Sequence, residues 1–107
     1  MTIKKIVEIY VTSSDKKPFI EWLESLDDKI RYRVKERLDR VLLGNLGDNK
    51  FIKNGVFELR LDFGSGYRIY FGNEKKFFIV LRCGGNKSTQ NKDIKKALEY
   101  WKDYLSR

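Results

Sequence analysis

Residues 55–71, which read GVFELRLDFGSGYRIYF, contain two runs of alternating apolar and polar side chains. The alternation has the period of two that is typical of β-strands, and the glycines between the two runs favour a turn. If the runs pair antiparallel through this turn, one face of the pair is apolar. The other face then carries Glu58, Arg60, Arg68 and Tyr70. We expect this second face to be exposed to solvent and able to hold a phosphate group.

The rest of the chain predicts further elements around this strand pair. β-branched residues predict a first strand over residues 3–11, and apolar side chains at helical spacing predict three helices. The helices are expected from residue 18 to about 26, from residues 27–28 to about 44, and from residues 88–89 to about 105. A loop is expected at residues 44–50, followed by strands at 56–63, 67–71 and 76–83.

This order predicts a single α+β domain that spans residues 1–107. Its antiparallel sheet is expected to combine the N-terminal strand with a three-stranded meander. Two N-terminal helices and one C-terminal helix are expected to pack against one face of this sheet.

The chain is strongly basic. It has 23 Lys and Arg against 15 Asp and Glu among its 107 residues, which gives a formal net charge of +8. Such a charge favours encounter with a polyanion, either a nucleic acid or an acidic protein. A membrane partner is not expected, because no long apolar segment occurs and the first nine residues are interrupted by Glu8. We therefore expect a cytoplasmic protein.

Histidine is absent and Cys83 is the single cysteine. An internal disulfide is therefore impossible, and we expect no metal site and no cofactor. A nuclease built from this chain lacks the common histidine acid and base. RNA offers another route, because its own 2′-hydroxyl can attack the neighbouring phosphate once charge on the phosphoryl oxygens is stabilised.

The charged face suits such a reaction. Arg60 and Arg68 on neighbouring strands can grip phosphate oxygens, since the planar guanidinium forms paired hydrogen bonds with them. Glu58 between them either orients the arginines or acts as a base, and Tyr70 is a candidate proton donor or stacking surface. The alternative is that Glu58 merely neutralises the arginines in cross-strand salt bridges.

A glycine-rich segment follows the last predicted strand. Residues 83–90, which read CGGNKSTQ, place Lys87 at the expected start of a helix, where anions are favoured. The segment is not a P-loop, because the spaced glycine before Gly-Lys-Ser/Thr is missing. We include Lys87 among the catalytic candidates. Four further residues are expected to contact RNA: Lys53, Arg82, Asn86 and Gln90.

These residues also carry a family resemblance. Residues 57–60 (FELR), 66–70 (GYRIY) and 81–90 (LRCGGNKSTQ) resemble the addiction-module killer proteins, a HigB-like branch of the RelE/ParE superfamily of bacterial toxins. The resemblance implies helices packed on an antiparallel sheet, and often ribosome-dependent mRNA cleavage without a metal. It also implies a cognate antitoxin of the helix-turn-helix DNA-binding type. The toxin is then expected to contact operator DNA only through this antitoxin.

The resemblance assigns roles by position. Arg68 matches the arginine that stabilises the scissile phosphate, Arg60 occupies a position that is usually basic, and Lys87 falls near a later basic catalytic position. Two positions depart from the pattern. Glu58 stands where RelE-type toxins carry a lysine implicated as base, and Ile94 stands approximately where a tyrosine is expected. Glu58 as base, with Lys87 or Tyr70 supplying a proton, is the resulting hypothesis.

Three other functions remain open from the sequence. ParE-type members of the same superfamily inhibit DNA gyrase by binding, without ribonuclease chemistry. A basic module that binds RNA or the ribosome without cleaving is a second alternative. The third is a toxin that has lost its toxicity.

Overall fold

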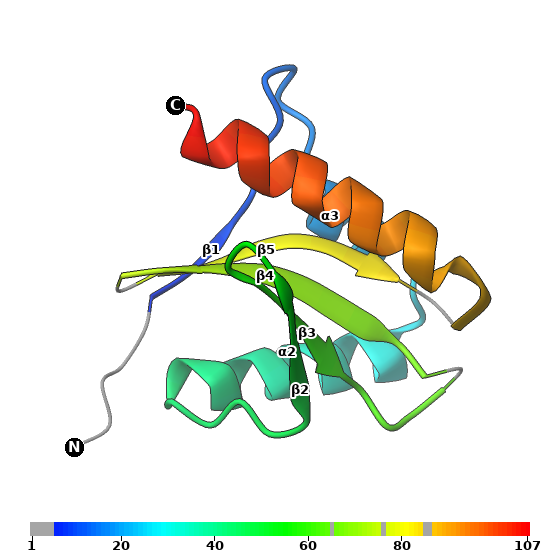
Figure 1. Cartoon of the computed structure of the whole chain (residues 1–107). Coiled ribbons are helices and arrows are strands. Elements are labelled where there is room, and N and C mark those ends of the chain that lie inside the picture. The colour runs from blue at the N-terminus through cyan, green and yellow to red at the C-terminus, as the bar shows by residue number, and fades with distance from the viewer. Residues whose placement is uncertain (1–5, 65, 76, 85–86) are drawn as a thin grey trace.

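A computed structural model describes residues 6–64, 66–75, 77–84 and 87–107. These residues form a five-stranded sheet. Helices lie on both of its faces (Figure 1). The strands lie in the order β1-β5-β4-β3-β2. The first half of the chain forms β1 (Ile6–Ile9), α1 (Pro18–Glu24), α2 (Asp28–Leu42) and β2 (Asn49–Lys53). The second half forms β3 (Val56–Arg60), β4 (Arg68–Glu74), β5 (Phe77–Gly84), the 3₁₀ turn η1 (Lys87–Thr89) and α3 (Gln90–Leu105).

The α+β class and the three predicted helices are confirmed, whereas the predicted sheet was incomplete. Strand β2 lies partly within residues 44–50, which we expected to form a loop. It is an edge strand with mostly exposed side chains, and an irregularity between Phe51 and Lys53 breaks its alternation. The hydrophobic pattern of a strand is weak in such a segment.

The sheet is mixed rather than antiparallel. Strands β2 to β5 pair antiparallel in sequence order, but β1 pairs parallel with β5. The connection from β1 runs through both N-terminal helices, and the chain then forms the meander before β5 reaches β1. Alternation within one strand reports which side chains share a face. It carries no information on the direction of a distant neighbour.

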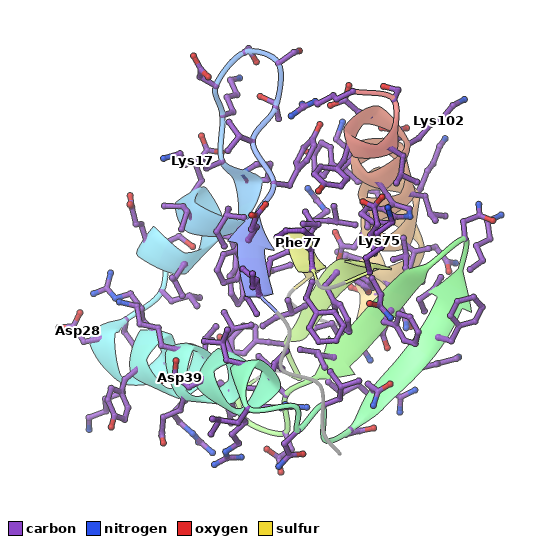
Figure 2. All side chains as sticks on the ribbon, turned by 90° about the vertical axis from the view of Figure 1, so that its left-hand side faces the viewer. Lys17, Asp28, Asp39, Lys75, Phe77 and Lys102 are labelled. Carbon is purple, nitrogen blue, oxygen red and sulfur yellow. The ribbon has the colours of Figure 1, made fainter. Side chains whose placement is uncertain are left out.

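Helices cover both faces of the sheet, which corrects the expectation that all three would pack on one face. Helices α1 and α2 pack on one face around Phe19, Leu23 and Val34, and α3 packs on the other around Ala97 and Trp101. Figure 2, turned by 90° from Figure 1, places Asp28 and Asp39 on α2 and Lys102 on α3, on opposite sides of the sheet. Both faces of the sheet carry apolar side chains, so helices must pack on both faces to bury them.

The α3 face of the sheet is fitted closely to Trp101. A Cβ atom added to Gly72 on β4 would lie only 2.2 Å from the Trp101 ring. The indole Nε1 donates a hydrogen bond of 2.7 Å to the carbonyl oxygen of Asn54, between β2 and β3. Two residues further along α3, the Tyr10 hydroxyl donates to Asp103 Oδ2 over 2.5 Å. Burial, reinforced by this hydrogen bond, raises the pKa of Tyr10 to about 12.

A β-bulge in β5 decides where Arg82 points. Tyr70 pairs with Arg82 and Phe71 pairs with Val80, so Leu81 is an extra residue in β5. Strict alternation predicted Arg82 on the same face as Phe78 and Val80. The bulge shifts the alternation by one and places Arg82 on the α3 face, opposite Tyr70.

Replacing Gly72 by alanine is expected to destabilise the fold by about 1–3 kcal/mol, because the new methyl group overlaps the Trp101 ring. Urea unfolding of purified protein measures this change. A Lys92→Ala variant, on the exposed surface of α3, is the control and should stay within about 0.5 kcal/mol of the parent.

The contact with Trp101 can be isolated by a double-mutant cycle. In a Trp101→Leu background the cost of Gly72→Ala should shrink markedly, because the smaller side chain leaves room for the methyl group. An undiminished cost would show that the glycine acts through something other than this contact.

Candidate phosphate-binding site

The strand register aligns a row of polar residues across the α3 face of the sheet. Lys50 on β2 pairs with Glu58 on β3, Glu58 pairs with Tyr70 on β4, and Tyr70 pairs with Arg82 on β5. Arg60 and Arg68 form the next pair on the same face. Together with Gln90, which reaches Glu58 from α3, the structure thus brings together six of the predicted residues: Glu58, Arg60, Arg68, Tyr70, Arg82 and Gln90.

Glu58 is the centre of this cluster and has no exposed surface. Its Oε1 accepts a hydrogen bond from Arg60 Nε at 3.4 Å and lies 3.7 Å from Arg68 Nε. Its Oε2 accepts a hydrogen bond of 2.9 Å from Gln90 Nε2, at the start of α3. The side chains of Arg60 and Arg68 are 47% and 16% exposed. A buried carboxylate therefore holds two guanidinium groups that still reach the surface.

The cluster is more buried than the sequence suggested. We expected the face with Glu58 and Tyr70 to be exposed, but neither residue has any accessible surface, because the first turns of α3 cover this part of the sheet. Burial, followed by the nearby Glu58 carboxylate, raises the pKa of Tyr70, so its phenol stays neutral. Neither side chain can touch a substrate in this arrangement.

Two buried polar atoms in the cluster lack a hydrogen bond. Within the described part of the chain, the Tyr70 hydroxyl and Arg68 Nε have no hydrogen-bond partner. Buried polar groups in a purely structural core are nearly always satisfied. Both atoms lie beside the Glu58 carboxylate, and Arg68 Nε is 3.7 Å from Glu58 Oε1, just beyond hydrogen-bond distance.

Arg82 is held by α3. Its Nε and Nη2 donate to Asp93 Oδ1 over 3.2 and 3.1 Å, and the Thr89 hydroxyl donates to Asp93 Oδ2 over 2.8 Å. A Cβ atom on Gly84 would lie 2.4 Å from Asp93 Oδ2, so glycine leaves the space for this carboxylate. Arg82 thus anchors the first turn of α3. No role for Asp93 was expected from the sequence.

Of the remaining predicted residues, Lys53 lies apart from the cluster, and the side chains of Asn86 and Lys87 are not among those that the structure describes. Lys53 lines a separate pocket with Trp101 and Lys102, because the irregularity in β2 brings it opposite Val56. Asn86 lies outside the described residues, and of Lys87 only the backbone, in η1, is described. Lys50 was not expected in the site, because a loop was predicted over residues 44–50, whereas Lys50 lies in β2.

A pocket of about 200 Å³ opens beside the two arginines. It is lined by Arg60, Arg68 and Tyr67 together with the carboxylates of Asp48 and Asp62, and we call it the clamp pocket. Asp48 and Asp62 are exposed, unlike Glu58. The arrangement offers two oriented cations for an anion and two accessible carboxylates for a proton.

No helix in the described ranges is both long and apolar enough to cross a membrane. In the same ranges, no three carboxylate or thiol side chains come together as a possible metal site.

Comparison with known proteins places the chain in a family. Residues 21–102 match the family described as "Phage derived protein Gp49-like (DUF891)". The chain is also similar to an uncharacterised protein of Haemophilus influenzae, with 45% identity over 80 residues that cover 74% of this chain and 81% of that protein. The matched region contains every described residue of the cluster. The chain therefore belongs to the Gp49-like family of phage-derived proteins, a family of addiction-module toxin-like proteins.

Proposed function

We propose that this protein is the toxin of a type II toxin–antitoxin module of the RelE/ParE type, and that it cleaves mRNA on the ribosome without a metal. The observation that carries the proposal is the pair Arg60 and Arg68, fixed by the buried Glu58 beside an open pocket. Membership of a toxin-like family supports the biological role.

The proposed reaction uses the RNA's own nucleophile. The 2′-hydroxyl oxygen attacks phosphorus as its proton leaves, the bond from phosphorus to the 5′-oxygen breaks, and the 5′-oxygen takes up a proton. The products are a 2′,3′-cyclic phosphate and a 5′-hydroxyl. Arg60 and Arg68 stabilise the charge that develops on the phosphoryl oxygens, which is where catalysis of phosphoryl transfer gains most.

The burial of Glu58 bears on its role. A base must come within hydrogen-bond reach of the 2′-hydroxyl, and a carboxylate without exposed surface does not meet that condition. We assign Glu58 the positioning of the two arginines. Asp48 and Asp62 line the clamp pocket and are the accessible proton acceptors, while Lys50 and Lys87 are the candidate proton donors.

The proposed partner is an antitoxin with an acidic amphipathic segment. A groove of about 500 Å³ runs between α3 and the β2–β3 turn, where Leu98, Trp101 and Leu105 form an apolar floor. Three lysines, Lys53, Lys95 and Lys102, line the same groove and outnumber the carboxylate of Glu99, which also lines it. Charge complementarity therefore supports an occupant that is apolar on one side and acidic at its margins.

The direct test is inducible expression with and without the neighbouring gene, scored by growth and by mapping of mRNA 5′ ends. We expect growth arrest, with cuts confined to translated messages and relieved by the neighbour. A gyrase inhibitor of the ParE type would instead cause DNA damage with mRNA intact. A non-cleaving RNA-binding protein would bind RNA in a salt-dependent way and leave the ends unchanged.

Arg68→Ala is expected to lower cleavage of ribosome-bound mRNA by about 100-fold or more, because one of two groups that stabilise the phosphoryl charge is lost. Cleavage is measured by primer extension, and folding by circular dichroism and urea unfolding. Arg31→Ala, which removes an arginine paired with Asp28 on α2, is the matched control and should cleave at the parent rate. Parent-rate cleavage by Arg68→Ala would contradict the clamp.

Glu58→Gln is expected to lower cleavage by about tenfold, because the amide keeps the shape of Glu58 but loses the charge that orients both arginines. The shape of the pH–rate profile should stay that of the parent. If Glu58 were the base, the acidic limb of the profile would disappear and the loss would reach about 100-fold or more. A variant indistinguishable from the parent would exclude both roles.

A further inference from the structure

A second pocket adjoins the clamp pocket. It has a volume of about 330 Å³, near the lower end of the range for small-ligand sites, and lies between α2 and the end of β3. We call it the α2 pocket. The two pockets share the wall formed by Asp48, Arg60, Leu61 and Asp62. When the phosphate between two nucleotides occupies the clamp pocket, the base of one of these two nucleotides is therefore within reach of the α2 pocket.

The lining of the α2 pocket mixes both signs of charge with an aromatic ring. Arg33, Glu36, Arg37 and Arg40 come from successive turns of α2. The Arg33 guanidinium carbon lies 4.2 Å from the centre of the Phe63 ring, so the two planar groups are associated. Arg37 is already engaged, because its Nη2 donates to the backbone oxygens of Leu46 and Asp48.

The other charged side chains of α2 in this pocket are available to a ligand. Within the described ranges, Arg33, Glu36 and Arg40 form no ion pair, and all three are exposed. The lining combines three carboxylates with four arginines, so it offers hydrogen-bond acceptors as well as donors. A ligand that presents donors and acceptors on one flat body can use both, and a nucleobase is such a ligand.

Guanine matches the lining most completely. Its N1 and N2 are adjacent donors for a carboxylate, which can only accept, and its O6 and N7 are acceptors for a guanidinium. No other RNA base offers two adjacent donors together with two acceptors in this way. We propose that the α2 pocket binds the guanine base of a nucleotide next to the scissile phosphate, so that it sets the sequence preference of cleavage.

The roles follow from position. Glu36 accepts from guanine N1 and N2, Arg40 donates to O6 and N7, and the Arg33–Phe63 pair stacks on the ring. This inference rests on the proposed function, because it places the clamp pocket at the scissile phosphate. Glu36 lines the α2 pocket and does not line the clamp pocket, so it separates recognition of the base from the chemistry.

The first experiment measures binding of the four nucleoside 5′-monophosphates to the full-length protein by calorimetry. We expect the guanine nucleotide to bind about tenfold or more tightly than the other three, and Glu36→Gln to remove this preference. Asp39→Asn is the matched control and should keep the preference. It neutralises an exposed carboxylate on α2 (Figure 2) that does not line the pocket. Equal binding of all four nucleotides, or binding of poly-glutamate in place of any nucleotide, would overturn the proposal.

The second experiment maps cleavage sites on translated mRNA. The parent protein should cut preferentially beside guanine, and Glu36→Gln should still cut but lose this enrichment. Cleavage that depends on Arg68 without any guanine enrichment would overturn the base pocket and leave the proposed function intact. Absence of cleavage by the parent would overturn the proposed function, and the nucleotide titrations would then decide the pocket alone.

Discussion

The Glu58 carboxylate lies on the sheet without any contact with solvent, and its burial depends on contacts with several other segments of the chain. An ionised group in such a place is tolerated only when cations and hydrogen-bond donors surround it. Arg60 comes from the same strand, Arg68 from the next strand, and Gln90 from a helix 32 residues further along the chain. The carboxylate thus requires the β3–β4 pairing and the docking of α3 at the same time.

This arrangement divides each arginine between two tasks. The Nε atoms of Arg60 and Arg68 face Glu58, and both residues line the clamp pocket. Cations held in this way need little reorganisation when an anion arrives, which is the physical basis of electrostatic preorganisation. The same burial removes Glu58 and Tyr70 from direct contact with a substrate. The groups that fix the site are therefore distinct from those that face the pocket.

Small departures from regular structure position α3. The extra residue Leu81 turns Arg82 toward the helix, and Gly84 leaves room for the Asp93 carboxylate that Arg82 binds. Gly72 does the same for Trp101 further along the sheet. The first of these contacts sets the start of the helix, and hence the position of Gln90 above Glu58. A side chain in place of either glycine would displace α3, the helix that covers the site.

The sequence by itself determined the α+β class, the three helices and the residues that share the charged face, because alternation with period two and spacing with period 3.6 are local properties. It also singled out Glu58, Arg60 and Arg68 as neighbours. Only the tertiary structure decided that α3 covers this face, that β1 pairs parallel, that β2 adds an edge carrying Lys50, and that a bulge reorients Arg82. These features depend on contacts between segments far apart in the chain, such as Glu58 with Gln90 and Gly72 with Trp101, and no local pattern records them.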